Sequence, residues 1–394
     1  MKILVTNVFG PLNLGDFELF STLIKKISIN NNKISAIARD PKLCSEHFPN
    51  INFYEQLGKA SNPLYRIIYL LLCFLYIFSF FRPLCKLLLP SDQYNALASL
   101  KKMDLVIGCP GGFLEDSSFS FYTHAMQVYI CSKLSKKMIM SPMSIGPVKN
   151  KFNLFILKSC LKNIEIIFTR EEISHELCNS LKLNNKLSSD LAFDEFIENN
   201  KINNHPKNKK VYFTVINWNF PNYNQKEKEV LFEKYIDSLV DTAKFIYEKY
   251  KFEIKIINQV DSDSFAIDQF HQKLLNLSVP SEIVFRDSNP KQVMNELKNA
   301  ELVIASRFHS AIFSLNVGAP VIAISYLPKT TGMLDLYGAS ELYQNIDSIN
   351  TEDLIALSDK FINDNESYLS IRSVFQKNLM AQENNFDIYL NNEI

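Results

Sequence analysis

ELVIASRFHSAIFSLNVGAPVIAISYLPKTTG, residues 301–332, contains two short apolar runs separated by a helical pattern. The runs ELVIAS and APVIAISY are rich in β-branched residues, which is typical of strands buried on both faces of a sheet. The stretch therefore predicts a strand, a helix and a second strand of one parallel sheet. Arg307 and His309 follow the first of these strands, and Lys329 follows the second.

The same alternation of strand and helix patterns runs along the whole chain in two series. The expected strands are 2–7, 104–109, 136–144 and 164–170 in the first series, and 209–217, 252–259, 281–287, 301–307 and 319–326 in the second. Two consecutive series indicate an α/β protein with two Rossmann-like, doubly wound domains, each built on a parallel sheet that helices cover on both faces.

A polar stretch rich in Asn and Lys, residues 198–210, predicts a solvated linker between the two domains. We expect an N-terminal domain over 1–200 and a C-terminal domain over 207–375. From Thr351 onward we expect two helices, the last of which, 376–394, packs back on the first domain.

The composition excludes several classes of protein. Lys plus Arg equals Asp plus Glu at 42 each, so the chain lacks the basic footprint of a nucleic-acid binder. The scattered cysteines form no CxxC pair, which argues against a disulfide scaffold and a metal site. The start, MKILVTNVFG, leads directly into a strand without the pattern of a signal peptide, so we expect a cytoplasmic protein. The seven cysteines are Cys44, Cys73, Cys85, Cys109, Cys131, Cys160 and Cys178.

One very apolar run, IIYLLLCFLYIFSFF at 67–81, has two interpretations. It is shorter than the roughly 20 residues that a helix needs to cross a bilayer. It is either a buried helix or helical hairpin, or a helix pair near 64–90 that inserts into one leaflet. In the second case Arg66, Arg82 and Lys86 would lie near phosphate headgroups.

Basic side chains follow the predicted strands in both domains. Arg170 ends one strand of the first series, while Arg307 and Lys329 follow strands of the second. Ligands of open parallel sheets bind beyond the carboxyl ends of the strands, so a cleft between facing domains would bring these cations together. His309, in the first turn of the next helix, is placed to lend a proton to an anion that Arg307 holds. The pattern predicts a small substrate with more than two negative charges or with two anionic groups.

Three loops rich in small residues also follow strands. NVFGPLNLGD places Asn13, Gly15 and Asp16 at a helix start, where Asp16 is either a simple N-cap or a contact for a sugar hydroxyl. GCPGGFLED and MSIGP are the other two loops, and together the three favour a cleft for a ligand. His124 and His175 fall inside predicted helices and are given no role. The further residues expected at this cleft are Gly111, Gly112, Ser144 and Gly146.

These motifs resemble those of the polysaccharide pyruvyl transferase family. NLGD, GCPGGFLED, SIGP, TREEIS, SSDLAF and the stretch from SRFHS to KTTG occur in this order over nearly the whole chain. The chain departs from the family pattern at Cys109 and Pro110, where glycines are usual, and at Phe17 after the GD pair. The last motif is the most specific of the series.

The resemblance implies a GT-B-like fold and transfer of pyruvate from phosphoenolpyruvate to two hydroxyls of a sugar, which forms a cyclic ketal on a cell-surface polysaccharide precursor. By resemblance, Arg170, Arg307, His309 and Lys329 form the phosphoenolpyruvate site. His309 is the expected acid, and Asp16 or Asp116 the expected base. The resemblance implies no cofactor or metal beyond the co-substrate.

Such acceptors are often built on polyprenyl carriers, so the run at 67–81 would keep the enzyme at the inner face of the cell membrane. Two alternatives stay open from the residues. One is a sugar-nucleotide glycosyltransferase of the same architecture, in which the cations hold a diphosphate. The other is a membrane-associated scaffold without catalytic activity. Neither the oligomeric state nor the acceptor sugar follows from the sequence.

Overall fold

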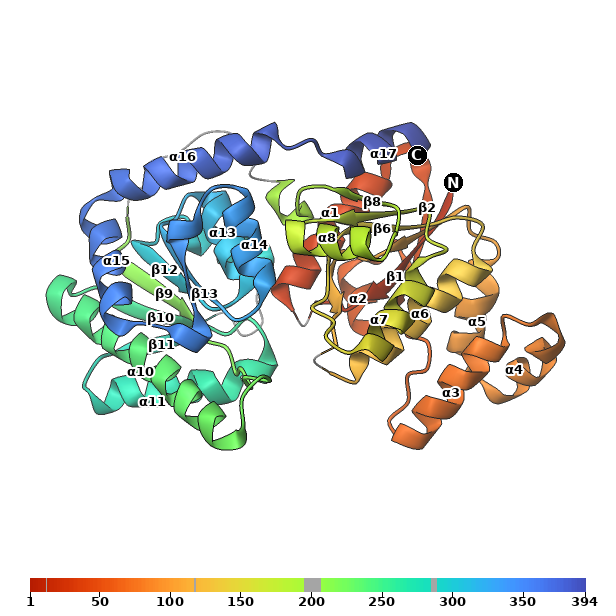
Figure 1. Cartoon of the computed structure of the whole chain (residues 1–394), viewed down its shortest axis with the longest axis horizontal. Helices are drawn as coiled ribbons and strands as arrows, with labels where there is room; N and C mark the ends of the chain where they lie inside the picture. The colour runs from red at the N-terminus through yellow and green to blue at the C-terminus, as the bar shows by residue number, and fades with distance from the viewer. Residues whose placement is uncertain (12, 117, 195–206, 285–288) are drawn as a thin grey trace. The chain divides into compact units, whose positions relative to one another are not determined.

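The computed structural model describes residues 1–394 except 12, 117, 195–206 and 285–288, so most of the predicted linker at 198–210 lies outside the described residues. The chain forms two compact units. Unit 1 comprises Met1–Pro11, Asp16–Leu191 and Glu383–Ile394; unit 2 comprises Leu12–Gly15 and Ala192–Gln382. Figure 1 shows a parallel sheet in each unit with helices on both of its faces.

The sheet of unit 1 has the strand order β3-β2-β1-β4-β6-β7-β8, and β5 pairs with β6. The strands of this sheet pair in parallel. The order reverses between β1 and β4, as in doubly wound sheets. The strands are β1 (Lys2–Val8), β2 (Lys33–Ala38), β3 (Asn52–Glu55), β4 (Leu105–Gly108), β5 (Gly111–Leu114), β6 (Met138–Ile145), β7 (Ile166–Thr169) and β8 (Asn185–Leu187).

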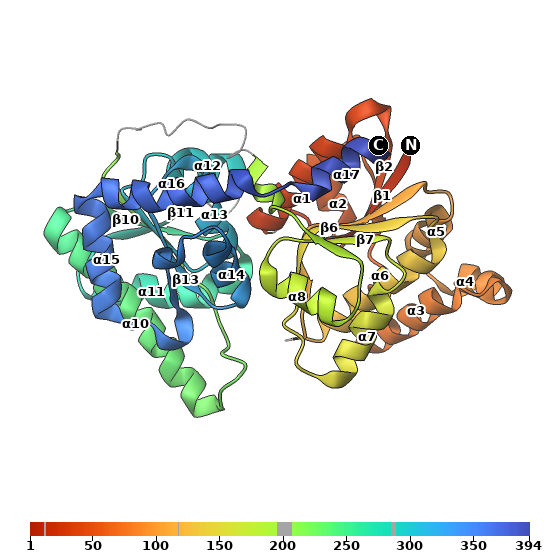
Figure 2. The ribbon, with the colours of Figure 1, turned by 45° about the horizontal axis from the view of Figure 1, so that its top comes forward.

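Helices of unit 1 come from both ends of the chain. The C-terminal helix α17 packs on this unit, where the Phe386 ring lies 5.2 Å from that of Phe168 and Lys26 pairs with Asp387 at 2.8 Å. Figure 2 shows α17 beside α1. The helices are α1 (Leu14–Ile27), α2 (Pro41–His47), α3 (Pro63–Leu75), α4 (Arg82–Leu88), α5 (Ser91–Leu100), α6 (Ser120–Leu134), α7 (Lys151–Leu161), α8 (Glu172–Ser180) and α17 (Asn385–Glu393), with 3-10 turns η1 (Ile29–Asn31), η2 (Ser79–Phe81) and η3 (Leu191–Phe193).

The sheet of unit 2 has the strand order β11-β10-β9-β12-β13-β14, again with parallel pairings throughout. Its order reverses between β9 and β12, whose carboxyl ends therefore mark the expected ligand edge. The strands are β9 (Lys210–Thr214), β10 (Glu253–Ile257), β11 (Ser281–Val284), β12 (Leu302–Ala305), β13 (Val321–Ser325) and β14 (Tyr343–Asn345).

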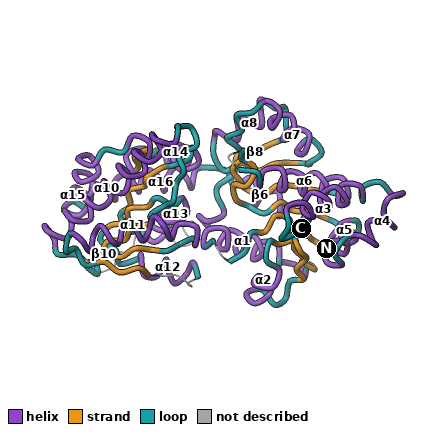
Figure 3. Tube along the Cα trace, turned by 90° about the horizontal axis from the view of Figure 1, so that it is seen from below, coloured by secondary structure: helices purple, strands orange, loops and turns teal. Residues whose placement is uncertain are grey.

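The helices of unit 2 are capped by polar side chains. Asn224 and Glu227 form a reciprocal capping box at the start of α10, and α16 is tied to the core where Tyr368 donates to the carbonyl of Ala319 at 2.7 Å. Figure 3 shows the strands of each unit enclosed by helices. The helices are α10 (Gln225–Tyr250), α11 (Ser264–Asn276), α12 (Pro290–Leu297), α13 (Phe308–Val317), α14 (Pro328–Leu336), α15 (Thr351–Asn363) and α16 (Asn365–Ala381), with η4 (Asp261–Asp263), η5 (Ser340–Leu342) and η6 (Ile346–Ser348).

The predicted fold class, two doubly wound α/β sheets, is confirmed. The prediction of two helices after Thr351 is wrong, because this segment forms three. Asp364 caps the N-terminus of α16 by accepting the Ser367 amide, and Asn384 caps α17 in the same way. Within the described part of the chain, no helix has both the length and the apolar character to cross a bilayer.

Candidate functional site

Arg307 stands at the carboxyl edge of the unit 2 sheet, two residues after the end of β12. Register with β9 places Ala305 opposite Thr214, and the Arg307 amide donates to the Thr214 hydroxyl at 3.2 Å. The neighbouring Ser306 hydroxyl accepts from the buried phenol of Tyr235 at 2.7 Å. The strand pairing and this buried contact fix the turn from which the Arg307 side chain leaves.

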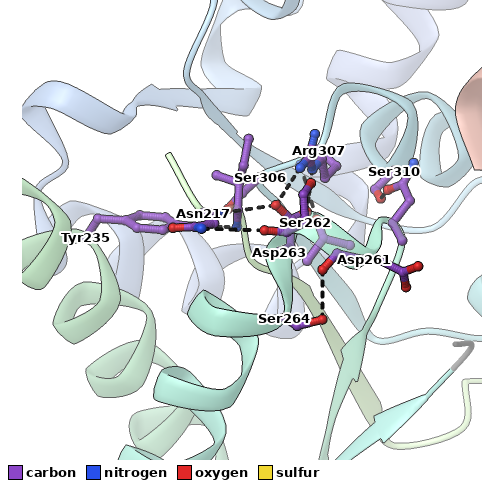
Figure 4. A network of polar contacts seen from close by, with 12 residues as sticks. Asn217, Tyr235, Asp261, Ser262, Asp263, Ser264, Ser306, Arg307 and Ser310 are labelled. Carbon is purple, nitrogen blue, oxygen red and sulfur yellow. Dashed lines mark hydrogen bonds and ion pairs between the residues drawn. The ribbon is translucent and has the colours of Figure 1, made fainter. Parts of the chain in front are cut away.

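Asp263, from η4, binds the Arg307 guanidinium at two nitrogen atoms (Figure 4). Its Oδ2 accepts from Nε at 2.7 Å, and its Oδ1 accepts from Nη2. Asp263 is buried and also accepts the Asn217 amide at 3.1 Å. Burial alone would lower the pKa of Arg307, but nearby Tyr326 and Asp263 outweigh it and raise that pKa. The guanidinium is therefore charged and held in one orientation, with Nη1 outside the pair.

Lys329 and Tyr326 lie together at the end of β13. The Lys329 ammonium is 5.5 Å from the ring centres of both Phe308 and Tyr326, within the range of a cation–π contact. Burial would raise the pKa of Tyr326, yet the charges of Lys329 and Arg307 outweigh it and lower that pKa. The Tyr326 ring also contacts Trp218, with ring centres 4.9 Å apart. Two cations thus surround one phenol at this edge.

His309 lies in the first turn of α13 and is largely buried. The centre of its ring lies 5.1 Å from the centre of the Phe308 ring. Gly15 lies against the same ring, because a Cβ built at Gly15 would fall 1.9 Å from Nδ1 of His309. Asn13 shapes this approach by accepting the Gly15 amide at 3.0 Å. Any side chain at position 15 would overlap the His309 ring, so the NLGD motif needs its glycine here.

Arg170 follows β7 in unit 1 and is also paired with a buried aspartate. Its Nη1 donates to Asp190 at 2.6 Å and its Nε to the Ser144 hydroxyl at 2.9 Å. A Cβ at Gly112 would lie 3.6 Å from Nη2 of Arg170, so the glycine loop passes beside the guanidinium. Both members of the ion pair are almost fully buried.

The two candidate bases occupy different surroundings in unit 1. A Cβ at Gly111 would lie 3.7 Å from Oδ1 of Asp16, so Asp16 faces the same glycine loop as Arg170. Asp116 instead holds the connection between β6 and α7, since its Oδ2 accepts the amides of Lys149 and Asn150 at 3.1 and 3.2 Å. It also accepts the side-chain amide of Asn153 at 3.1 Å.

The structure therefore places the predicted residues in two groups. In unit 2, Arg307, His309 and Lys329 lie at one sheet edge with Asn13 and Gly15. In unit 1, Gly111, Gly112 and Ser144 gather near Arg170 and Asp16, whereas a Cβ at Gly146 would face Leu177 at 3.0 Å. The convergence of Arg170 with the cations of unit 2 stays a prediction.

Four residues of these groups were missed from the sequence: Asp190, Asp263, Tyr326 and Trp218. Asp190 lies in the quoted motif SSDLAF, and Asp263 follows β10, so the strand-end rule that found the arginines signals Asp263 as well. Nothing local marks Tyr326 or Trp218. Across the residues that the structure describes, no cluster of three His, Cys, Asp or Glu side chains could hold a metal ion.

Solved structures of low identity share this fold over nearly the whole chain. Anabaena Alr3699/HepE, solved in complex with UDP-glucose, is 12% identical with a TM-score of 0.57, covering 100% of this chain and 98% of that one. Sucrose-phosphate synthase from Thermosynechococcus elongatus is 9% identical with a TM-score of 0.59, covering 100% and 97%. A glycosyltransferase from Rickettsia africae is 13% identical with a TM-score of 0.59, covering 99% and 95%. These likenesses show the fold alone, which is of the GT-B type.

Sequence comparisons identify the family. The amylovoran biosynthesis protein AmsJ of Erwinia amylovora is 23% identical over 287 residues, a match that spans 65% of this chain and 65% of that protein, just under two thirds of its length. A family model described as polysaccharide pyruvyl transferase matches residues 20–328. The chain belongs to the polysaccharide pyruvyl transferase family.

Proposed function

We propose that this protein transfers pyruvate from phosphoenolpyruvate to two hydroxyls of a sugar in a cell-surface polysaccharide precursor, forming a cyclic ketal. The observation that carries the proposal is the group of Arg307, His309 and Lys329 at the ligand edge of β12 and β13. Phosphoenolpyruvate carries one carboxylate and one phosphate, and family membership favours this donor over other dianions.

The two kinds of cation would act differently on the donor. Because Asp263 offsets the charge of Arg307, the guanidinium offers oriented N–H groups, which suit a planar carboxylate. Lys329 contacts two aromatic rings and supplies a compact charge suited to phosphate. Arg170 of unit 1, held by Asp190, is proposed as the fourth donor-site residue.

The reaction then follows in balanced steps. His309 protonates the methylene carbon of phosphoenolpyruvate, and the adjacent carbon accepts the first sugar hydroxyl. The bond from that carbon to the phosphate oxygen breaks, and inorganic phosphate leaves with its bonding electron pair. The second hydroxyl adds to the same carbon and closes the ketal. One hydroxyl proton restores His309, and the other is taken by a carboxylate base and passes from it to the released phosphate. Arg307 and Lys329 stabilise the departing negative charge.

Asp16 is the preferred base for the sugar hydroxyl. Its carboxylate faces the glycine loop at Gly111, where no Cβ blocks the approach of a ligand. Asp116 already accepts three N–H groups through one oxygen, which is the pattern of a residue that holds a loop. The acceptor is proposed to bind in unit 1, and no cofactor is required beyond phosphoenolpyruvate.

We further propose that the enzyme works in the cytoplasm at the inner face of the membrane, on a sugar linked to a polyprenyl carrier or a nucleotide. The direct experiment incubates the full-length protein with phosphoenolpyruvate and lipid-linked or free glycosides, and follows phosphate release and product mass. In deuterated water the ketal methyl group should gain one deuterium, since the proton on that carbon comes from an exchangeable acid.

Two outcomes would oppose the proposal. Transfer of a glycosyl group from a nucleotide sugar would favour a sugar-nucleotide glycosyltransferase, the alternative to which the UDP-glucose complex of HepE points. No product with any donor, although phosphoenolpyruvate binds, would favour a scaffold without catalytic activity. Arg307→Ala should abolish phosphoenolpyruvate binding, and an unchanged affinity would mean that the donor site lies elsewhere.

A further inference from the structure

The segment 64–88 of unit 1, here called the apolar hairpin, exposes an unusual concentration of large hydrophobic side chains. Of the 23 such exposed side chains among the described residues, ten lie in these 25 positions. They come from α3, η2 and α4, and one comes from the three-residue connection between α3 and η2. The ten are Leu64, Tyr65, Ile67, Ile68, Leu71, Phe78, Phe80, Leu84, Leu87 and Leu88.

The apolar hairpin is anchored to unit 1 by a different set of side chains. Leu72, Cys73, Tyr76 and Cys85 are buried in the core cluster of the unit, as is Leu89, the next residue after the hairpin. The Cys85 thiol donates to the carbonyl of Leu72 at 3.2 Å, which ties α4 to α3. The exposed side chains are therefore not the ones that attach the hairpin to the core of unit 1. A buried-helix interpretation of 67–81 accounts for only one side of the hairpin.

Exposure is greatest where the hairpin projects furthest from the sheet. Phe80 is 86% exposed and Leu87 is 79% exposed. Figures 1 and 3 place α4 at the outer end of unit 1, beyond α3 and α5. Such a concentration of exposed apolar side chains on a folded unit indicates an interaction site, because exposed leucines scattered singly are common but a concentration of them is not.

The charged residues of the apolar hairpin all have one sign. No Asp or Glu occurs between Glu55 and Asp92, whereas Lys59, Arg66, Arg82 and Lys86 lie within that stretch. Lys59 pairs with Glu55 at 3.3 Å, so the hairpin's own cations are Arg66, Arg82 and Lys86. Lys101 joins them in space, since burial and then the charge of Arg82 lower the pKa of Lys101. The hairpin itself thus carries basic residues and no acidic one, which favours an anionic surface.

We propose that the apolar hairpin inserts into one leaflet of an anionic lipid bilayer, with α3 and α4 in the plane of the interface. The 13 residues of α3 reach about 20 Å at 1.5 Å per residue, against about 30 Å for the hydrocarbon core, so insertion is limited to one leaflet. Leu87 and Phe80 enter furthest, and Arg66, Arg82 and Lys86 meet the lipid phosphates. Charge complementarity favours lipid over a second copy of the chain, whose hairpin would bring like charges together.

The test is co-sedimentation of the full-length protein with phosphatidylcholine vesicles, with and without phosphatidylglycerol. The double variant Phe80→Glu/Leu87→Glu replaces two largely exposed side chains, of which Phe80 makes an edge contact with the Phe81 ring, so it should fold normally. Its matched control is Phe152→Glu/Phe155→Glu on α7, since those rings are 64% and 67% exposed in the same unit. Circular dichroism and the unfolding midpoint check the fold of each variant.

Wild-type protein should bind the phosphatidylglycerol vesicles more tightly than the neutral ones. The hairpin variant should lose about tenfold or more of that affinity and the control variant none. Absence of wild-type binding, or equal loss in both double variants, would overturn the proposal. So would a wild-type dimer that the hairpin variant dissociates without any effect on vesicles. The assay contains no donor, so its outcome is independent of the transfer reaction.

Discussion

Arg307 and Asp263 form a two-point ion pair at the edge of the unit 2 sheet, and Arg170 and Asp190 form a buried pair in unit 1. In each case the arginine lies within two residues of the end of a strand, and the aspartate comes from another segment of the same unit. A buried guanidinium without a partner would be costly, whereas the paired group stays charged and fixed in direction. Since each aspartate offsets the charge of its arginine, these arginines offer a ligand N–H groups of fixed direction rather than net positive charge.

The first prediction concerns this pair. Asp263→Ala should lower the free energy of unfolding by about 3 kcal/mol, because Arg307 is left without its buried partner. It should also weaken phosphoenolpyruvate binding about tenfold or more, because the guanidinium loses its orientation. Urea unfolding and calorimetric titration measure the two effects. Asp261→Ala, at an exposed position of the same 3-10 turn, is the control and should change neither.

The second prediction uses the contact between Gly15 and His309. Gly15→Ala places a methyl group where the imidazole lies, so the ring must move. The turnover number should fall by about 10²-fold or more, close to the loss from His309→Ala. In the His309→Ala background the same glycine substitution should cost almost nothing in either activity or stability. Additive losses in the double variant would mean that Gly15 acts through something other than His309.

The fold could be predicted largely because its central strands are buried on both faces. β1, β4, β6, β9, β12 and β13 carry continuous apolar runs. The strands missed from the sequence include β3, β8 and β14 at sheet edges, where most side chains are only half-buried or exposed. No run of apolar residues marks such strands. β5 was missed because its two glycines are typical of a turn.

The candidate site could also be predicted only in part, because some of its residues are neighbours in the sequence and others are far apart in it. Arg307, His309 and Lys329 follow strands in one continuous stretch, so their common edge follows from the strand-end rule. The partner of Arg307 lies 44 residues earlier, and only the register of β9, β10 and β12 brings the two together. The role of Gly15 depends on a ring almost 300 residues further along the chain. Such contacts leave no periodic signal.

The third prediction separates the two candidate bases. Asp16→Asn should reduce the turnover number with little change in phosphoenolpyruvate affinity, because the carboxylate acts on the sugar. Asp116→Asn should retain most activity but lower stability, since the loop at Lys149 and Asn150 loses a charged acceptor. Steady-state kinetics and thermal unfolding of both variants measure the difference. The reverse result would exchange the two assignments.

The fourth prediction is a pH dependence of stability from His124. Burial, and then the charge of Arg39, lower the pKa of His124 from 6.5 to about 4. The unfolded chain therefore binds a proton that the folded chain does not between these values. The contribution of neutral His124 is complete above pH 6.5 and is lost as the pH falls, by about 1.4 kcal/mol per unit. Urea unfolding from pH 7 to 4.5 should show this loss. It should disappear in His124→Gln and persist in His47→Gln, at an exposed position.

The fifth prediction uses Trp218, the single tryptophan of the chain, as a reporter of the donor edge. Tyr326 lies 4.9 Å from it, ring centre to ring centre, and a phenolate there quenches tryptophan emission. Since Lys329 and Arg307 lower the pKa of Tyr326, emission should fall in a step centred below pH 10 as the pH rises. Lys329→Met should move the step to higher pH, because one of the two cations is lost. Tyr326→Phe should abolish the step, whereas Tyr223→Phe, which removes a phenol whose pKa Asp347 raises, should leave it in place. A step that survives Tyr326→Phe would show that Trp218 senses another group.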